Sequence, residues 1–249
     1  MKIEVIPTHE KYEQFLELYP PIQSNKELPD WYKNMNLGNK KSMYNSFHNG
    51  IWEGSYTAKK CPAIQDFLSS GLIIPLWSDL VYKEDKNGSD WYFTAPDATG
   101  DKLSEHLSYH SDYQTDGMNY GKTFGGLTLK IGLPYRFIVP KGYNVLYQDP
   151  FYHFRGKIRC LTGLVEVDKW GYITFPFEIL EKDFLLEAGT PLVHAIFYKR
   201  DNTKLEINCR KGTEQEYKET KETFFELGNN HPHYKELRTV QKYNNLREL

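Results

Sequence analysis

The chain has 249 residues, of which 39% are hydrophobic and 15% aromatic, and its 31 basic and 33 acidic side chains leave a formal net charge of −2. A chain of this length and composition can bury a sizeable core, in one large or two small domains. The near-neutral charge excludes the chain-wide cationic field on which nonspecific duplex binding depends, so there is no strong nucleic-acid signal.

The three cysteines, Cys61, Cys160 and Cys209, are odd in number and far apart. Their spacing argues against a disulfide framework and lacks the paired Cys-x-x-Cys spacing of a zinc site. The first seven residues alternate like a strand and lack the apolar run of a signal peptide. The longest apolar run, 71–77, is too short to cross a bilayer and contains a proline. We therefore expect a cytoplasmic protein without a membrane span.

The N-terminal portion, residues 1–96, combines short helices with strands. Helical patterns at 8–21, 28–35 and 61–71 are followed by strand patterns at 72–77, 80–83 and 90–94. The last two strands flank Asn87-Gly88, and an Asn-Gly pair between apolar runs predicts a hairpin because both residues tolerate positive φ. Residues 97–122 are polar and rich in Tyr and His, so we expect a long loop or an irregular edge, which leaves open whether it acts as a lid.

A strand core is expected from about 126 to 208. Seven short strands are predicted near 127–131, 135–139, 144–148, 157–161, 164–166, 172–179 and 192–199, with 205–208 as an eighth candidate. This spacing indicates a barrel or sandwich rather than a parallel α/β sheet. We therefore predict a mainly β, barrel-like fold, with a double-stranded β-helix (jelly roll) as the alternative.

The sequence pattern changes after Arg210 from that of strands to that of helices, with helical spacing at 213–227 and again at 234–246. The charged side chains lie on one side of these helices and the aromatic ones on the other, a pattern that ordinarily docks on a parent domain. We predict a single β-rich domain at 1–210 and, at 211–249, C-terminal helices packed on that core.

Three segments between 135 and 200 carry a family resemblance: Pro140-Lys-Gly-Tyr143, which opens a strand; Gly163-Leu-Val-Glu-Val-Asp-Lys-Trp-Gly171; and the closing strand from Leu186 through Gly189 to Phe197. In strand order and turn placement this stretch resembles the core of the trimeric deoxyuridine triphosphatase and deoxycytidine deaminase superfamily. The resemblance covers about a quarter of the chain. It implies a β-clip core and, because its relatives form three-fold assemblies that share each site, a homotrimer.

The whole chain also resembles a family of bacteriophage proteins. The matching segments are Pro29 to Lys33, Cys61 to Pro75, His110 to Gln114 and the Gly189-Thr-Pro strand. This second resemblance covers more residues but implies no activity. If the chain is phage-encoded, it implies the host cytoplasm as the location.

Carried over by position, the triphosphatase resemblance implies that Glu166 activates the attacking water, with Asp168 as its neighbour. Trp170, displaced from the aromatic position, would contact the ligand together with Arg136 and Tyr143. Two departures bear on activity. A Glu for the family's Asp moves the carboxylate by roughly an ångström, enough to misplace a general base, and the family's Arg-Ser-x-Gly segment has no counterpart near 148–152.

Cations and rings gather between residues 135 and 159. The cations are Arg136, Lys141, Arg155, Lys157 and Arg159, beside several Tyr and Phe residues. Such a mixture can hold phosphates and stack bases, and it also fits an aromatic β surface with solubilising charges. Our first hypothesis is therefore a protein that binds a small anionic ligand such as a nucleotide in a β-clip cleft, without an intact triphosphatase motif.

A second hypothesis rests on His110 and Asp112, followed by His194. This is the spacing of a 2-His-1-carboxylate triad, which holds Fe(II) in oxygenases that use 2-oxoglutarate. It requires His110 and Asp112 on one face of a strand, at i and i+2. The alternative is that the first two are loop residues and His194 a neutral core histidine. A third hypothesis is a structural or host-interaction protein without catalysis, so whether the chain is an enzyme stays open at this point.

Overall fold

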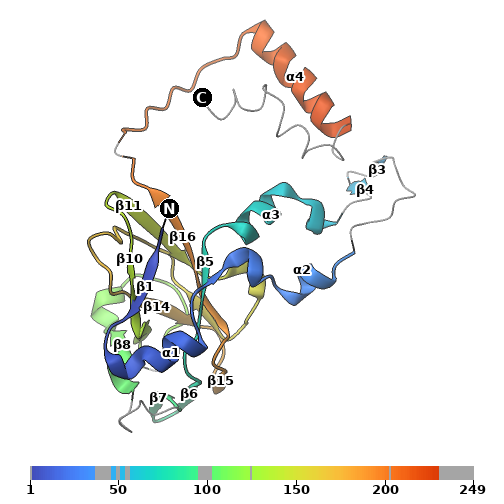
Figure 1. The fold of residues 1–249 in the computed structure, drawn as a ribbon. Coiled ribbons are helices and arrows are strands. Elements are labelled where there is room, and N and C mark those ends of the chain that lie inside the picture. Colours follow the sequence, from blue (N-terminus) through green and yellow to red (C-terminus); the bar gives the residue numbers. More distant parts are fainter. Residues whose placement is uncertain are drawn as a thin grey trace. The chain divides into compact units, whose positions relative to one another are not determined.

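The computed structural model describes residues 2–36, 46–48, 51–53, 57–94, 103–123, 125–201 and 203–229. The chain divides into two compact units, whose elements are labelled in Figure 1. The first comprises Met1–Met35 and Leu68–Asp201, and the second comprises Asn36–Phe67 and Asn202–Leu249.

The first unit is mainly β, which confirms the predicted fold class. Its strands are β1 (Glu4–Pro7), β2 (Ile22–Gln23), β5 (Leu72–Pro75), β6 (Leu80–Asp85), β7 (Gly88–Phe93), β8 (Leu107–His110), β9 (Thr128–Gly132), β10 (Tyr135–Ile138), β11 (Tyr143–Gln148), β12 (Ile158–Cys160), β13 (Gly163–Val165), β14 (Thr174–Ile179), β15 (Phe184–Leu186) and β16 (Pro191–Lys199). Its helical turns are η1 (Glu10–Tyr12), α1 (Glu13–Leu18), η2 (Ser24–Lys26), α2 (Asp30–Asn34), η4 (Leu103–His106), η5 (Asp112–Thr115) and η6 (Phe151–His153).

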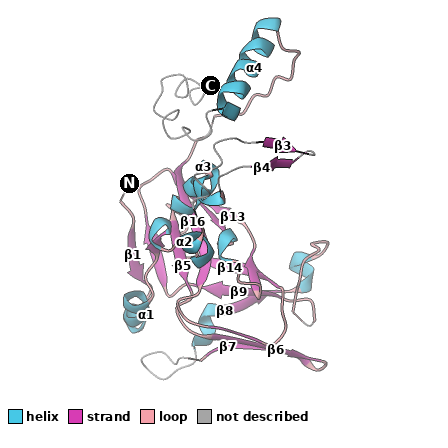
Figure 2. Ribbon diagram, turned by 90° about the vertical axis from the view of Figure 1, so that its right-hand side faces the viewer, coloured by secondary structure: helices cyan, strands magenta, loops and turns pink. Residues whose placement is uncertain are grey.

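These strands form antiparallel sheets (Figure 2). The largest sheet has the order β13-β11-β16-β5-β2, and a second has the order β12-β14-β9-β8. A three-stranded sheet, β15-β6-β7, and the pair β1-β10 complete the unit. Each of these sheets has two free edges, so the strands that the structure describes close no barrel.

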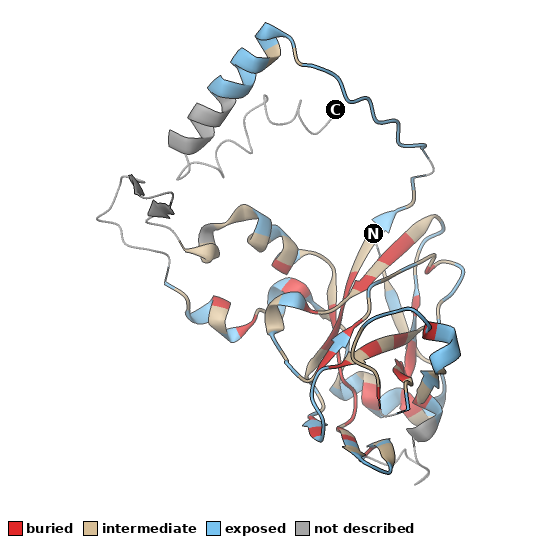
Figure 3. Cartoon of the chain, turned by 180° about the vertical axis from the view of Figure 1, so that it is seen from behind, coloured by how far each residue is buried: buried red, intermediate tan, exposed pale blue. Residues whose placement is uncertain are grey.

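The core explains why the chain is so rich in aromatic residues. In β10, β12, β14 and β15 the buried positions alternate with more exposed ones, as a period-2 pattern requires. In β5, β9 and β16 consecutive positions are buried (Figure 3). Tyr147 of β11 and Phe175 of β14 meet edge to face, with ring centroids 4.9 Å apart. The fully buried Trp77 donates its indole N–H to the carbonyl oxygen of Gly132 at 3.2 Å. Rings from different sheets therefore fill the space that small aliphatic side chains would leave empty.

The hairpin predicted around Asn87-Gly88 is confirmed. Strands β6 and β7 pair from Leu80–Phe93 to Asp85–Gly88. Oδ1 of Asp85 accepts the backbone N–H groups of Asn87 at 2.7 Å and Gly88 at 3.1 Å. The side chain of Asp85 therefore satisfies the donors that the tight turn leaves free.

Other sequence-based expectations need correction. The eighth strand candidate, 205–208, is an exposed segment with no strand pairing among the described residues. The segment 184–186 forms strand β15, which was not predicted. For residues 97–122, where a long loop or an irregular edge was expected, residues 107–110 form the edge strand β8 on β9, in agreement with the second form.

The second unit contains β3 (Ser46–His48), β4 (Ile51–Glu53), η3 (Ala58–Lys60) and α4 (Glu214–Asn229), and α3 (Pro62–Ser69) crosses its sequence boundary with the first unit. Strands β3 and β4 pair antiparallel. Helix α4 confirms the helix predicted at 213–227, whereas the one at 234–246 lies outside the described residues. That the C-terminal helices pack on the core stays a prediction. In the described part of the chain, no helix has the length and apolar composition to span a bilayer.

Candidate functional site

The two acidic residues singled out in the sequence, Glu166 and Asp168, follow β13 and both contact Arg200. Nη1 of Arg200 lies 2.8 Å from Oε2 of Glu166, and its Nη2 lies 2.5 Å from Oδ1 of Asp168. The other oxygen of Asp168, Oδ2, accepts the backbone N–H of Gly142 at 2.7 Å. These contacts tie together the turn after β13, the turn before β11 and the end of β16.

Both carboxyl groups are held in the ionised form. A hydrogen bond from Lys169, supported by the charge of Arg200, lowers the pKa of Glu166. The N–H of Gly142, also with the charge of Arg200, lowers the pKa of Asp168. A general base works best with a pKa near the working pH. The lowered pKa values and the ion pairs with Arg200 therefore fit a structural clamp formed by Glu166, Asp168 and Arg200 (the Arg200 clamp) better than a water-activating pair.

The three predicted ligand-binding residues lie around this clamp in different ways. Tyr143 begins β11 and is half-buried, and its carbonyl oxygen accepts an N–H of Arg200 at 3.4 Å. Trp170 is 69% exposed. Arg136, on the exposed side of β10, packs against Gly171, where an added Cβ would lie 3.8 Å from Cβ and Cδ of Arg136. Arg136 and the Trp170–Gly171 segment are therefore surface neighbours.

The three residues of the predicted iron site have separate surroundings. Strand β8 ends at His110 and η5 begins at Asp112, so the two do not share the strand that an i, i+2 pair requires. Oδ1 of Asp112 pairs with Nζ of Lys122 at 3.0 Å. His194 lies on β16 in a different sheet. Among the described residues, no three His, Cys, Asp or Glu side chains form a group that could hold a metal ion. The structure therefore does not assemble the predicted triad.

His194 is instead a buried core residue. Its Nε2 lies 2.5 Å from the carbonyl oxygen of Ser70 and 3.2 Å from Oγ of Ser24. Burial lowers the pKa of His194, and the bond to Ser70 opposes this effect. The ring is therefore neutral at pH 7, as the alternative to the iron site supposed.

A different arginine, Arg155, is the candidate for ligand binding. It lies between η6 and β12, and its side chain is only 5% exposed. Its Nη2 pairs with Oδ1 of Asp149, whereas Nε and Nη1 have no hydrogen-bond partner among the described residues. A guanidinium stays charged and offers five N–H donors. A buried donor without a partner costs roughly 1–3 kcal/mol, and more when it is charged. Arg155 therefore offers unused, buried donors to an anion.

Asp149 fixes the position of Arg155. The same oxygen that pairs with Arg155 also accepts the backbone N–H of Cys160 at 2.9 Å. Burial lowers the pKa of Arg155, and the charge of Asp149 opposes this effect. Burial also raises the pKa of the Cys160 thiol to about 12, so this neighbour adds no charge. Among the described residues, the guanidinium is thus anchored only at Nη2.

Aromatic rings gather at the turn that precedes Arg155 in the chain. The indole N–H of Trp31, from α2, donates to the carbonyl oxygen of Tyr152 at 2.6 Å. The ring of Trp31 lies 5.9 Å from that of Tyr152 and 6.2 Å from that of Phe154, measured between centroids. Phe154 is 70% exposed and has a left-handed backbone with φ of 46°. Such a conformation costs of order 1–3 kcal/mol, and strain of this kind clusters at functional sites.

The remaining titratable groups here add little net charge. Burial, and then the charge of Arg155, lower the pKa of His153 to about 4, so that its ring is neutral at pH 7. His194 and Lys33 also lower the pKa of His153, and the charge of Asp149 raises it, so these groups lie within electrostatic range of His153. Lys33 pairs with Asp30 at 3.3 Å. Each cation here therefore has a carboxylate beside it.

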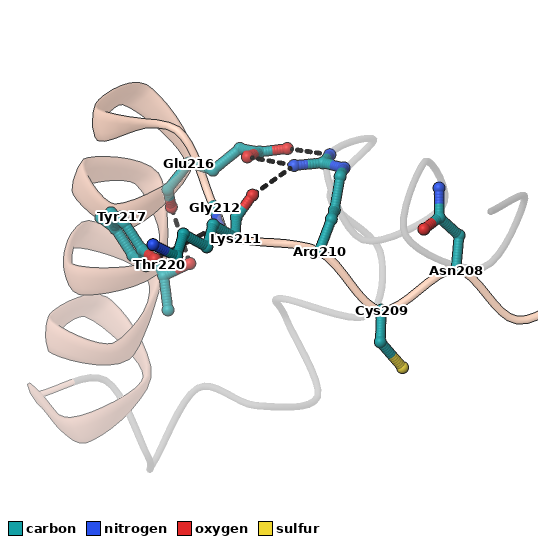
Figure 4. A pocket seen from close by; sticks show the side chains of 8 residues that line it. All are labelled: Asn208, Cys209, Arg210, Lys211, Gly212, Glu216, Tyr217 and Thr220. Atoms are coloured by element: carbon teal, nitrogen blue, oxygen red, sulfur yellow. Dashed lines mark hydrogen bonds and ion pairs between the residues drawn. The ribbon is translucent and has the colours of Figure 1, made fainter.

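The second unit has a surface hollow of its own (Figure 4). It is lined by Asn208, Cys209, Arg210, Lys211, Gly212, Glu216, Tyr217 and Thr220. Arg210 is engaged, because its Nη1 and Nη2 lie 2.9 and 2.6 Å from the two carboxylate oxygens of Glu216. This hollow therefore offers less to an anionic ligand than the donors of Arg155.

No protein-family model and no curated protein match the chain. Among solved structures, it is similar to the native EIAV dUTPase, with 11% sequence identity and a TM-score of 0.29. The similarity covers 54% of this chain and 99% of that one. At this level the likeness carries no argument about the site.

Proposed function

We propose that the first unit binds a small anionic ligand at Arg155. The observation that carries the proposal is the buried guanidinium with Nε and Nη1 unpartnered among the described residues. Phosphate and carboxylate oxygens are the strongest partners for such donors, because both sides of the hydrogen bond are charged. Asp149 supports the assignment, since it holds the guanidinium in one orientation.

A nucleotide is the ligand class that the neighbouring rings favour. Phe154, which precedes Arg155 in the chain, has an exposed ring, and the indole of Trp31 lies 6.2 Å from it between centroids. Stacking of a base on an aromatic ring contributes about 1–3 kcal/mol and tolerates different bases. A ligand with both an anion and a flat ring would use both features of the site.

Entry of the ligand requires local opening, because Nε and Nη1 of Arg155 are shielded from solvent. The contact between Trp31 and Tyr152 joins segments 121 residues apart through one indole hydrogen bond. We take the contact between Trp31 and Tyr152 as the one that breaks when the ligand enters. Binding would then be slower than diffusion allows and would speed up when the indole bond is removed.

Binding without hydrolysis is the simpler form of this proposal, because Arg200 engages both Glu166 and Asp168. The trimer implied by the family resemblance belongs to the proposal as well. Light scattering of the purified protein tests it, and the mass of a single chain at micromolar concentration would remove it.

The proposal is tested by calorimetric titration of the protein with a panel of nucleotides. Wild-type protein should bind at least one of them, and Arg155→Lys should weaken that binding at least tenfold because lysine lacks the planar fork. The matched control is Arg159→Gln, which removes an exposed cation that pairs with Glu178 at 3.1 Å. Trp170→Ala tests the location implied by the resemblance. Binding that only Trp170→Ala abolishes would move the site to the Arg200 clamp, and no binding at all would end the proposal.

A further inference from the structure

We infer that the Arg155 site accepts a ligand with a single oxyanion group, one phosphate or one carboxylate on a flat ring, and discriminates against polyphosphates. The inference rests on the proposed function, because it names the class of ligand for the same site. It concerns how much negative charge the surroundings of Arg155 can balance.

The charges around the site are already almost balanced. Arg155 faces Asp149 and Lys33 faces Asp30. The two histidines near this turn, His153 and His194, add no positive charge at pH 7, because burial keeps both neutral. One anionic group can accept a hydrogen bond from an unpartnered nitrogen of Arg155. Each further phosphate would lie in the field of the two carboxylates, without a cation of its own among the described residues of this turn.

The supply of donors points the same way. Besides Nε and Nη1 of Arg155, Nε2 of Gln148 is buried and has no partner among the described residues. Gln148 precedes Asp149 and pairs in register with His194, a neighbour of His153. The unpartnered donors that the structure describes in this part of the first unit are few, which suits one phosphate or carboxylate better than a phosphate chain.

The backbone here offers no cradle for a phosphate chain. Polyphosphates are usually held by successive backbone N–H groups at a glycine-rich loop or at the start of a long helix. The turn η6 has three residues, it follows Pro150, which has no N–H, and the N–H of His153 donates to the oxygen of Pro150 at 2.8 Å. The backbone at this turn therefore adds few free donors.

Calorimetric titration of the full-length protein with matched probes tests the inference. The probes are a nucleoside, its monophosphate and its triphosphate, an aromatic carboxylate, and inorganic phosphate, each with and without Mg²⁺. We expect the monophosphate or the aromatic carboxylate to bind at least tenfold more tightly than the triphosphate and the nucleoside. The better of these two arms identifies which oxyanion the site takes. Inorganic phosphate should bind more weakly than either, because it lacks the ring.

Two variants separate the possible failures. Arg155→Lys should abolish the preference for the monoanionic probes, whereas Arg159→Gln should retain it. If the triphosphate binds as tightly as the monophosphate or more tightly, and Arg155→Lys weakens both, the inference is overturned and the proposed function stands. If no probe binds, or if binding is indifferent to Arg155→Lys while the variant melts cooperatively, the proposed function itself is overturned.

Discussion

Nη2 of Arg200 lies 2.5 Å from Oδ1 of Asp168, which ties the end of β16 to the turn that follows β13. Because Asp168 also accepts the N–H of Gly142, a single side chain with 8% exposure connects three segments of the first unit. A carboxylate in such a position stabilises the folded state. Its removal should therefore lower the free energy of unfolding.

Asp168→Asn should destabilise the protein at pH 7 and less so in acid. The folded state lowers the pKa of Asp168, first through the N–H of Gly142 and also through Arg200. Its contribution is therefore fully present above the unfolded pKa of about 3.9 and is lost as the pH falls through the folded value. Urea unfolding of wild type and variant at pH 7, 5 and 3.5 should show a gap that narrows below about pH 4. A gap that does not change with pH would contradict this account.

Gly71→Ala should be among the most damaging single-methyl additions in the first unit. Gly71 has φ of +74°, and an added Cβ would lie 2.1 Å from the carbonyl oxygen of Ala195 on β16. We expect a loss of at least about 3 kcal/mol in the free energy of unfolding. Gly117→Ala is the matched control, because Gly117 has φ of +75° and nothing within 4 Å of an added Cβ. The control should lose only about 1–2 kcal/mol, from the left-handed backbone alone. Equal losses of unfolding free energy in the two variants would show that the backbone of β16 shifts to accommodate the added methyl group.

The strands that were predicted correctly are those whose own residues carry a period of two and a turn signal. The hairpin β6–β7 is an example, since Asp85, Asn87 and Gly88 specify the turn locally. Strand β15 has three residues, too few to establish an alternation. Residues 205–208 do alternate, yet a strand needs a partner edge, and Leu205 and Ile207 are exposed at 86% and 75%. Pairing is a tertiary property that a local pattern does not contain.

The same limit applies to the candidate site. The family resemblance pointed to Glu166 and Asp168, and these do lie together, but their partner Arg200 is more than 30 residues away and outside the motif. Arg155 was one of five cations beside rings, and only burial distinguishes it from Arg159. The role of Asp149 and the approach of Trp31 had no local signal. Which of several similar side chains forms a candidate site therefore depends on burial and on contacts between distant segments, and a local sequence pattern contains neither.

His106→Phe should make the protein less sensitive to acid. The ring of His106 is 4% exposed, lies 4.8 Å from that of Tyr12 and 5.1 Å from that of Trp77, and has no hydrogen-bond partner on either nitrogen among the described residues. Burial lowers its pKa to about 4. An unfolded histidine titrates near 6.5, so the unfolded chain takes up the proton first and stability falls as the pH drops from about 6.5 to about 4.

Phenylalanine keeps the ring of His106 and removes this titration. The variant should therefore match or exceed wild type at pH 7 and should lose up to about 3 kcal/mol less between pH 6.5 and pH 4. Denaturant unfolding across this range measures the difference. Parallel curves for the two proteins would show that His106 does not contribute to the acid sensitivity.

Thr213→Ala should loosen the start of α4. Oγ1 of Thr213 accepts the N–H of Glu216 at 3.3 Å, and Oε2 of Glu216 accepts the N–H of Thr213 at 2.7 Å, which is a capping box. Loss of the cap costs about 1 kcal/mol, equivalent to roughly fivefold faster hydrogen exchange in the first turn. Thr213→Ser keeps the hydroxyl and is the control. Unchanged exchange in the alanine variant would mean that α4 does not depend on this cap.

The pair Asp149 and Arg155 should show strong coupling in a double-mutant cycle. Arg155→Met leaves Asp149, whose side chain is 19% exposed, with the N–H of Cys160 as its one remaining partner among those that the structure describes. Asp149→Asn leaves the guanidinium, which is already short of partners, without its counter-charge. Each single variant should lose about 3 kcal/mol or more, because breaking a buried pair leaves one charge uncompensated. The double variant should recover at least about 2 kcal/mol of the summed losses, since neither charge then remains. Urea unfolding of the four proteins gives the coupling energy, and losses that simply add would show that Asp149 does not hold Arg155.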